Sequence, residues 1–296
     1  MAVGFFTDTT LCIGCKACEV ACKEWNQLPD DGLLFTGMSY DNTASLGAAT
    51  WRHVSFIERP VPLTGQETGL GNFSWLLMSD VCKHCQRAGC LEACPTGAII
   101  RTEFDSVYVQ PDICNGCGYC VVACPFGVID RREDDGRAWK CTLCYDRLKG
   151  GMEPACAKAC PTDSILFGEL DELRERAQDR LERLHRHGMS EAYLYGEDAA
   201  GQPGTEGLNA FFLLVDRPEV YNLPPEPVVP TKTVRAAWGS MGWAVLGMAA
   251  AAFGAVLSVR PSPPRPSSPR GRGGRKTRKN RDVFPLSPSG REGSGE

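Results

Sequence analysis

Apolar residues in this chain follow a helical period in one long stretch and a strand-like pattern in several short ones. From Glu169 to His187 they recur every three or four positions among charged residues, which is typical of a helix on a domain surface; this apolar face is Leu170, Leu173, Ala177, Leu181 and Leu184. Runs rich in β-branched and aromatic residues predict strands at Trp51–Arg59, Phe73–Ser79, Ala98–Arg101, Val107–Gln110 and Ser164–Phe167. We therefore expect an α+β fold, with a first hairpin that turns at the glycine-rich segment Gly65–Gly71.

One further stretch is apolar on all sides. The 22 residues from Trp238 to Val259 contain no charged side chain, and as a helix they would be about 33 Å long, enough to cross a bilayer core. Trp238 and Trp243 lie near one end, as aromatic residues at a membrane interface do. The alternative is a buried core helix of a soluble domain. Residues 218–237, which are rich in proline, predict a linker before this transmembrane helix, and the low-complexity tail 260–296 is expected to be disordered.

Charge is distributed unevenly along the chain. The tail from Arg260 to Glu296 contains ten Lys/Arg and three Asp/Glu, a net charge of +7, whereas the other residues carry 22 Lys/Arg and 33 Asp/Glu, a net charge of −11. The acidic body argues against nucleic-acid binding. Because positive flanks stay in the cytoplasm, the tail is expected in the cytoplasm and the body on the outer, periplasmic side of the cell membrane, with one span between them.

Sixteen cysteines form four compact runs, with none left over. The third run has the spacing C-x2-C-x2-C-x3-C-P, which bacterial ferredoxins use to bind 4Fe–4S clusters. The first run keeps this spacing but has Lys23 in place of the proline, while the second and fourth lengthen the middle gap and keep the final Cys-Pro. The runs are Cys12, Cys15, Cys18 and Cys22; Cys82, Cys85, Cys90 and Cys94; Cys114, Cys117, Cys120 and Cys124; and Cys141, Cys144, Cys156 and Cys160.

The spacing itself suits iron–sulfur chemistry. Three thiolates at positions i, i+3 and i+6 of a tight loop can reach one cluster, and the fourth cysteine ligates the other cluster in two-cluster ferredoxins, so that runs act in pairs. Glycines within the loops, such as Gly14, Gly116 and Gly118, let backbone amides approach the sulfur atoms. A zinc ribbon or a disulfide framework is the alternative, but neither explains three close cysteines followed by x3-C-P, repeated.

No residue pattern indicates bond chemistry. The sequence lacks a convincing nucleophile–base pair, a phosphate-binding loop and a molybdopterin signature, so we expect electron transfer without a catalytic site. Lysines near the runs could raise the reduction potentials of individual clusters, but they are expected to be ordinary solvated lysines; examples are Lys16, Lys23, Lys83, Lys140 and Lys158. The histidines His53, His84, His185 and His187 are not needed as ligands.

The quoted runs resemble a known family. C-I-G-C-K-A-C-E-V-A-C-K-E-W-N at 12–26, K-H-C-Q-R-A-G-C-L-E-A-C-P at 83–95, C-G-Y-C-V-V-A-C-P-F at 117–126, and K-C-T-L-C-Y-D-R with E-P-A-C-A-K-A-C-P-T within 140–162 are similar to the iron–sulfur (beta) subunit of membrane-bound respiratory formate dehydrogenase. The resemblance extends from about residue 8 to about residue 258, but it does not explain the shorter N-terminus or the basic tail.

The resemblance implies the domain organisation. Residues 1–168 would form two pseudo-symmetric dicluster ferredoxin-like units, with the hairpin insertion 26–80, followed by a surface helix and connecting segment at 169–217 and a single C-terminal transmembrane helix at 238–259. Run one would pair with run four, and run two with run three.

The resemblance also implies how the cysteines are shared among four 4Fe–4S clusters. Because Cys117 is present, no 3Fe–4S cluster is expected. The implied ligand sets are A, with Cys12, Cys15, Cys18 and Cys160; B, with Cys141, Cys144, Cys156 and Cys22; C, with Cys82, Cys85, Cys90 and Cys124; and D, with Cys114, Cys117, Cys120 and Cys94.

The partners follow from the same resemblance. A molybdopterin-containing alpha subunit, with molybdenum or tungsten, would oxidise formate, and a membrane cytochrome b, the gamma subunit, would take the electrons to quinone. Because the first residues do not have the features of a signal peptide, we expect export of the folded complex on a partner's twin-arginine signal. The alternatives are the same electron wire serving a hydrogenase or a polysulfide, sulfoxide or nitrate reductase, and a zinc-binding, membrane-anchored assembly protein.

Overall fold

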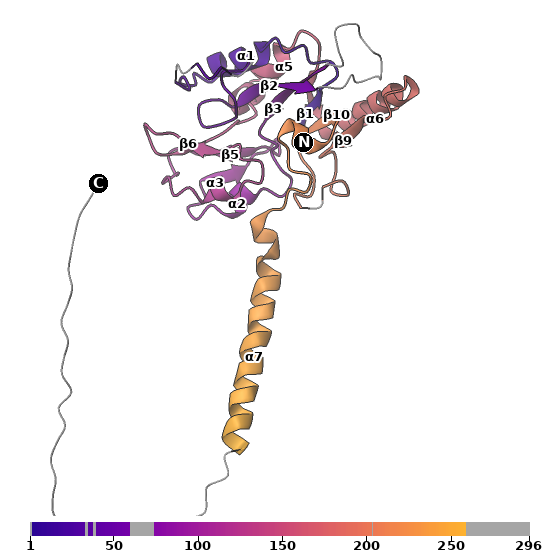
Figure 1. Ribbon diagram of the computed structural model, residues 1–296. Coiled ribbons are helices and arrows are strands. Elements are labelled where there is room, and N and C mark those ends of the chain that lie inside the picture. Colours follow the sequence, from indigo (N-terminus) through magenta and orange to yellow (C-terminus); the bar gives the residue numbers. More distant parts are fainter. Residues whose placement is uncertain (1, 33–34, 38–39, 60–73, 203, 259–296) are drawn as a thin grey trace, which may run out of the picture. The chain divides into compact units, whose positions relative to one another are not determined.

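The computed structural model describes residues 2–32, 35–37, 40–59, 74–202 and 204–258 (Figure 1). It divides into two units, Met1–Met241 and Gly242–Glu296. The first unit contains all sixteen cysteines, and it mixes short helices with strands, as the apolar pattern predicts.

A four-stranded sheet joins the beginning of the chain to residues 165–214. Its strands are β8 (Ile165–Glu169), β1 (Val3–Asp8), β10 (Ala210–Leu214) and β9 (Tyr193–Tyr195), in that spatial order. Strand β1 runs parallel to β10 and antiparallel to β8. Every residue of β1 and β10 is buried, which is why neither shows the alternation of a half-exposed strand. Only β8 was predicted, at slightly earlier bounds.

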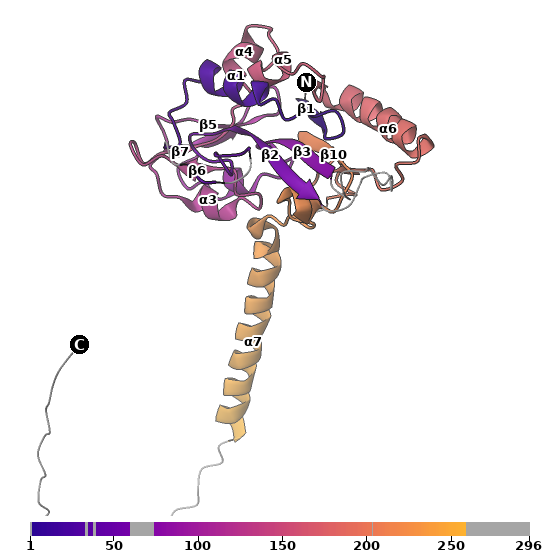
Figure 2. The same ribbon diagram turned by 45° about the horizontal axis from the view of Figure 1, so that its top comes forward.

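Helix α6 (Leu170–Arg186) confirms the predicted amphipathic helix and packs against this sheet (Figure 2). Leu170, Leu173, Ala177 and Leu184 of its predicted apolar face are buried, and Leu181 packs against them. On the polar side, Arg180 Nε donates to Asp8 Oδ2 at 2.7 Å, which ties the helix to the end of β1.

Three hairpins complete the strands. Strands β2 (Arg52–Arg59) and β3 (Ser74–Val81) form the predicted insertion hairpin, paired from Arg52 with Val81 to Arg59 with Ser74. Its predicted turn, Gly65–Gly71, lies outside the described residues. The predicted second hairpin is β4 (Ile99–Arg101) with β5 (Val107–Val109), and an unpredicted third one is β6 (Asp130–Arg131) with β7 (Ala138–Trp139).

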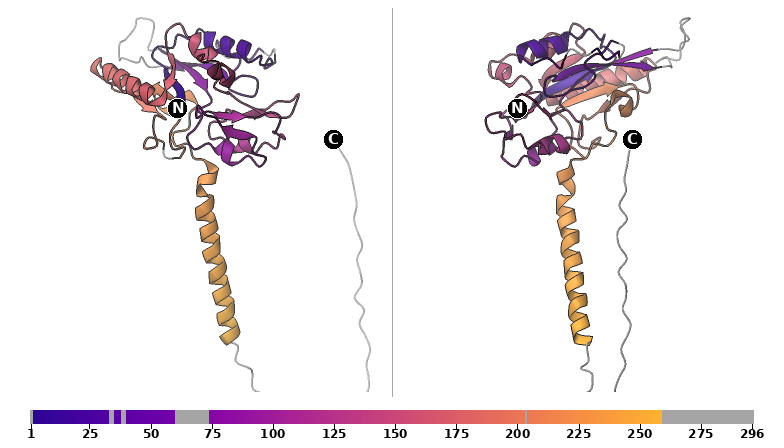
Figure 3. Two further views of the ribbon diagram at one scale, coloured as in Figure 1. Left: turned by 180° about the vertical axis from the view of Figure 1, so that it is seen from behind. Right: turned by 60° about the vertical axis from the view of Figure 1, so that its left-hand side comes forward.

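Short helices carry or follow the cysteine runs. They are α1 (Ala17–Trp25), α2 (Gly89–Glu92), α3 (Tyr119–Ala123), α4 (Tyr145–Lys149) and α5 (Ala155–Lys158). Helix α1, which follows run one, packs against α5 of run four, and α2 of run two packs against α3 of run three. The two pairs lie in different parts of the domain (Figures 1 and 3).

Part of the segment predicted as a proline-rich linker is packed on the domain. It contains the 3-10 turns η1 (Pro218–Tyr221) and η2 (Pro230–Thr233), and Tyr221, Leu223 and Val229 are buried. The apolar side chains between the prolines provide burial that a free spacer lacks. A hydrogen bond from Thr231 to Glu92 fixes the end of this segment beside α2.

The last described element is helix α7 (Val234–Ser258), which begins four residues before the predicted Trp238. Within the described part of the chain, residues 230–258 include the one helix long and apolar enough to cross a membrane, and its most apolar 18 residues have a mean hydropathy of 1.7. The helix is apolar on all sides, and Trp238, Trp243, Leu246 and Phe253 are exposed. The predicted tail, 260–296, lies outside the described residues.

Candidate iron–sulfur cluster sites

The same backbone turn occurs between the first two cysteines of every run. The residue just before the second cysteine has a positive φ in each case: Gly14 (68°), His84 (43°), Gly116 (72°) and Leu143 (59°). Glycine adopts this conformation without penalty, whereas the two L-residues carry a cost of roughly 1–2 kcal/mol. Four repeats of one turn, two of them strained, indicate that the geometry of the cysteine pair is required.

The last cysteine of three runs lies just beyond a short helix. Cys94, Cys124 and Cys160 follow α2, α3 and α5, and each is followed in turn by a proline, which cannot continue the helix. Run one lacks this proline, and α1 continues past Cys22 to Trp25. The run that lacks the proline is therefore also the one with the long helix.

The cysteines of predicted set A lie together. Cys12, Cys15, Cys18 and Cys160 all line one small cavity. The pKa of the Cys12 thiol is raised, mainly by burial and also by the negative charges that Cys160 and Cys15 would carry. The first and last runs of the chain thus meet here.

The cysteines of set B are also neighbours. Burial raises the pKa of the Cys22 thiol well above its ordinary value, and the nearby charges of Cys156, Cys141 and Cys144 raise it further. Cys22 and Cys156 are only 4% exposed. Four thiols that would repel one another as thiolates in a buried place need a positively charged group between them.

Runs two and three provide the other two groups. The pKa of Cys85 is raised by burial and by Cys82, Cys124 and Cys90, which are the members of set C. In set D, burial together with Cys114 and Cys117 raises the pKa of Cys120 to about 11, and Cys94 adds to this. In sets C and D, cysteines of runs two and three are therefore electrostatic neighbours, and the division of the ligands among clusters stays a prediction.

Neighbouring cysteines connect the four sets in succession. Cys18 of set A is an electrostatic neighbour of Cys156 of set B, Cys141 of set B is a neighbour of Cys82 of set C, and Cys90 of set C is a neighbour of Cys120 of set D. The spatial order is therefore A, B, C, D.

Exposed cysteines occur in the two end sets, A and D, and not in the middle sets, B and C. Cys15 of set A and Cys117 of set D are exposed, while every other cysteine is buried or half-buried. Exposed apolar residues lie beside both, with Ile13 in the first run and Tyr119 and Val122 on α3 of the third. The succession of cysteine sets therefore opens to the surface at both ends and is enclosed in the middle.

Backbone and hydroxyl groups point at several of the sulfur atoms. The amides of Ala138 and Leu143 each donate to a cysteine sulfur at 3.4 Å, to Cys114 and Cys141 respectively. Ser79 Oγ lies 3.2 Å from Cys18 Sγ. Donors of this kind stabilise thiolates bound to a cluster and help to set its potential.

Three buried cations lie among the cysteines. Arg52 and Lys140 are 1% and 2% exposed. Lys83 is also 1% exposed. The burial of Lys83 and Lys140 corrects the prediction that lysines near the runs are solvated, because the domain encloses the stems of both side chains. Lys158 is exposed, as expected. Sequence reasoning did not find Arg52, because it begins a strand in the insertion hairpin, far from any run along the chain.

The histidines have other partners. The Nδ1 of His84 accepts a hydrogen bond from the Val107 amide at 3.1 Å, and burial lowers the pKa of this imidazole well below its usual range. His53 pairs with Asp41 at 2.6 Å. His185 and His187 bond to carbonyl oxygens at the end of α6 and just beyond it.

The cysteine sets offer the ligands that iron–sulfur clusters use. Over the described ranges, no three cysteine, histidine or carboxylate side chains converge closely enough to hold one metal ion. A 4Fe–4S cluster takes four cysteine thiolates, and the sixteen cysteines supply enough of them for four clusters.

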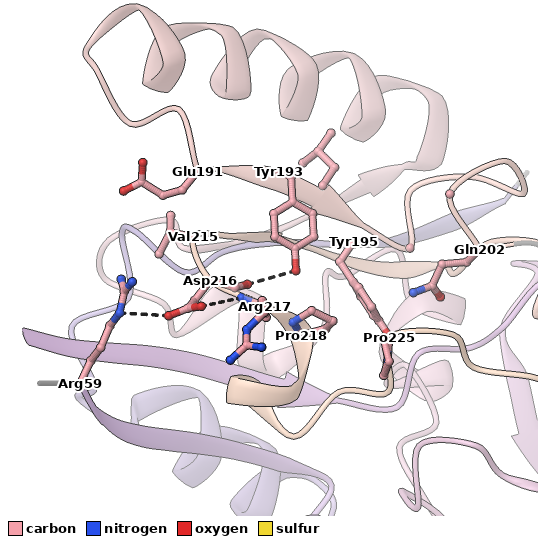
Figure 4. Close-up of a pocket in the computed structure, with 13 residues that line it drawn as sticks. Arg59, Glu191, Tyr193, Tyr195, Gln202, Val215, Asp216, Arg217, Pro218 and Pro225 are labelled. Atoms are coloured by element: carbon pink, nitrogen blue, oxygen red, sulfur yellow. Dashed lines mark hydrogen bonds and ion pairs between the residues drawn. The ribbon is translucent and has the colours of Figure 1, made fainter. Parts of the chain in front are cut away.

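A larger cavity lies away from this chemistry. It has a volume of about 510 Å³ and is lined by residues of β9 and the segment after β10, without a cysteine (Figure 4). Figure 4 shows the ion pair between Arg59 and Asp216, at 3.0 Å, at one end and Tyr195 with Gln202 at the other. Its lining offers no redox group.

Comparisons with known proteins agree with this geometry. Two family models, each described as a 4Fe-4S dicluster domain, match residues 11–98 and 73–170. These matches follow the sequence, whereas in space the first run lies with the fourth and the second with the third.

Several iron–sulfur subunits are similar over most of their length. That of the nitrate-inducible formate dehydrogenase of Escherichia coli K12 is 40% identical over 228 residues, 76% of this chain and 73% of that protein. The Haemophilus influenzae formate dehydrogenase iron–sulfur subunit is 39% identical over 226 residues, 75% and 68% of the two chains. One subunit of the anaerobic dimethyl sulfoxide reductase of E. coli is 34% identical over 179 residues, 60% and 78%. The chain therefore belongs to the family of formate dehydrogenase iron–sulfur subunits, which transfer electrons and are not the catalytic subunits.

Proposed function

We propose that this chain is an electron wire with four 4Fe–4S clusters, one in each of the cysteine sets A to D. The observation that supports it best is the arrangement of sixteen cysteines in four groups of four that follow one another in succession. Bound clusters would supply one-electron redox chemistry, and the protein would supply the thiolates, the amide donors and the burial that set each potential.

The positions of the two exposed ends indicate the direction of electron transfer. Set D lies in the part of the domain built from runs two and three, and α2 of run two is bonded to Thr231, three residues before α7 begins. If α7 spans the membrane, the end with Cys117 is the one nearer the bilayer. Electrons therefore enter at set A from a catalytic subunit and leave at set D toward a membrane partner.

The partners are those of the family. A molybdenum- or tungsten-containing alpha subunit that oxidises formate faces Cys15, and a membrane cytochrome b that reduces quinone faces Cys117. Helix α7 anchors the chain in the cell membrane, with the cluster domain on the periplasmic side and the basic tail in the cytoplasm. The relatives named for formate dehydrogenase, and the all-round apolar surface of α7, support this assignment.

A second candidate function is the same wire serving a different catalytic subunit. The 34% identity to a subunit of dimethyl sulfoxide reductase favours it, because the runs of cysteines do not depend on the substrate. That relative matches 60% of this chain and the formate dehydrogenase relative matches 76%, and so formate dehydrogenase is preferred.

The test is a count of iron and acid-labile sulfide per chain in the anaerobically purified complex, with the other subunits identified. After the clusters of the large subunit are subtracted, about 16 iron atoms per chain are expected. A complex that also contains a molybdopterin subunit and a cytochrome b, and that reduces quinone with formate, would support the full proposal. Zinc in place of iron, or about 12 iron atoms or fewer in a fully loaded preparation, would contradict four clusters.

A further inference from the structure

Arg52 lies at the boundary between cysteine sets A and B. Its Nη2 donates to Cys156 Sγ of set B at 3.3 Å, and its Nη1 donates to the Ser79 carbonyl at 3.2 Å. The hydroxyl of the same serine lies 3.2 Å from Cys18 Sγ of set A. One guanidinium group thus contacts one set directly and the other through Ser79.

Lys140 occupies the corresponding place between sets B and C. Its Nζ donates to the carbonyl oxygens of Cys141, at 3.0 Å, and of Val107. Cys82 and Cys90 of set C and Cys141 of set B are the charged neighbours of this buried ammonium group. The ammonium group therefore interacts with thiolates of two neighbouring sets.

Neither cation has a carboxylate partner within the described residues. A buried charge without a partner is strongly unfavourable. For Arg52, the groups that can carry the opposite charge are the thiol of Cys156, 3.3 Å from Nη2, and the thiol of Cys18 beyond Ser79. The negative charge that balances both cations is that of the cysteine sets.

We propose that Arg52 and Lys140 are shared charges of the wire, each of which raises the reduction potentials of the two clusters on either side of it. This inference rests on the proposed function, because it needs clusters in sets A to D. Cluster B, which lies between the two cations, is raised by both. Cluster D is raised by neither.

The physical reason is the charge that one electron adds. Reduction makes a cluster more negative by one unit, and a fixed positive charge in a dry, weakly polarisable surrounding stabilises that extra charge. A shared cation also keeps neighbouring potentials closer together than separate environments would. Electron transfer between neighbours then does not meet a large uphill step.

Two other lysines differ from Arg52 and Lys140 because each has a carboxylate partner. Lys83 is equally buried, but it forms an ion pair with Asp80, and so its charge is largely neutralised within the protein. Lys158, between Cys156 and Cys160 in the sequence, has a 71% exposed side chain and pairs with Glu153. Water and salt screen such an exposed charge. Lys158→Gln is therefore the matched control for the loss of one positive charge.

The experiment is a redox titration of the anaerobically purified complex, in which the four cluster signals are followed by electron paramagnetic resonance. Arg52→Gln is expected to weaken the electron affinity of two clusters by about tenfold each, ~59 mV for a one-electron couple. Lys140→Gln is expected to affect two clusters to the same extent, and one cluster is affected in both variants. Arg52→Lys keeps the positive charge, so both potentials should stay close to their wild-type values. Lys158→Gln should shift none of the four potentials.

Each outcome has a distinct meaning. The wild-type complex is measured first, and fewer than four clusters there would contradict the proposed function itself. Four clusters with no shift in either variant, equal shifts of all four, or a shift of the same size in Lys158→Gln would overturn the shared-charge inference alone. If Arg52→Gln does not retain its iron, the comparison of Arg52→Lys with Lys140→Gln still decides: a normal set of potentials in Lys140→Gln contradicts the inference.

Discussion

The two exposed cysteines, Cys15 and Cys117, are the residues at which the wire would meet other proteins. Both follow a glycine of positive φ, Gly14 and Gly116. The same turn precedes Cys85 and Cys144, which are not exposed, so the position of the set within the domain decides which thiol reaches the surface. At each end, the exposed cysteine would therefore serve both as a cluster ligand and as the shortest path for electrons to a partner protein.

Replacing Cys117 with alanine is expected to remove one cluster and about a quarter of the iron of the wild-type chain. Formate-dependent reduction of quinone should then be lost, whereas reduction of a soluble dye, which can take electrons upstream of set D, is partly retained. Iron content and the two activities are measured on the same preparation.

The control for Cys117→Ala is Val122→Ala, on the exposed side of α3, which removes no ligand. It should keep the full iron content. An equal fall of the dye-linked and quinone-linked activities in Cys117→Ala would show that the cysteine is needed for assembly of the complex and not for the last step alone.

At the scale of elements, the repeated cysteine turn is the feature that positions the ligands. In the turn of run three, a Cβ on Gly116 would lie 2.4 Å from the carbonyl oxygen of Gly136. This carbonyl belongs to the bend between β6 and β7, so that the hairpin and the turn support each other. Neither the bend nor the hairpin contains a cysteine.

Gly116→Ala is expected to destabilise this turn by more than backbone strain alone, because the clash adds to the roughly 1–2 kcal/mol cost of a positive φ. Gly127→Ala is the matched variant, since its φ is 63° and a Cβ there meets nothing within 4 Å. We expect faster loss of iron on exposure to air in Gly116→Ala, followed as the decay of visible absorbance. Equal decay in the two variants would mean that the contact with Gly136 does not matter.

Local elements were predictable where their own residues carry the pattern. The hairpin β2–β3 and helix α6 have their apolar residues at a clear period, and both were found within two residues of their bounds. Strands β1 and β10 were missed because they are buried on both faces and pair across about two hundred residues of chain. The grouping of the cysteines came from the family resemblance, and spacing within one run does not reveal which other run lies beside it.

At the scale of the whole molecule, the packed segment 218–233 connects the cluster domain directly to α7. Since Val229 is fully buried and Thr231 is bonded to Glu92, little free chain separates the domain from the helix. The part of the chain between the last strand and α7 is thus held on the domain and is not a free spacer.

Ending the chain after Thr233 is expected to move the protein from the membrane to the soluble fraction when it is produced with the alpha subunit but without a membrane subunit. Ending it after Pro261 keeps α7 and serves as the control, because only the basic tail is removed. Both truncated forms should retain their iron, since all sixteen cysteines precede Thr233. A soluble full-length chain under the same conditions would contradict a membrane-spanning α7.

A ribosome releases the cysteines in their order along the chain, at roughly 5–20 residues per second. The middle two runs are complete once Cys124 has emerged, whereas Cys12 must wait for Cys160 at the far end of the domain. Because one pair of runs lies inside the other along the chain, the sets become complete in a fixed order. The cysteines of sets C and D are all available during synthesis, whereas those of sets A and B are complete only after the last run appears. If the proposed clusters are inserted during synthesis, a chain that meets a shortage of iron would have sets C and D filled before sets A and B.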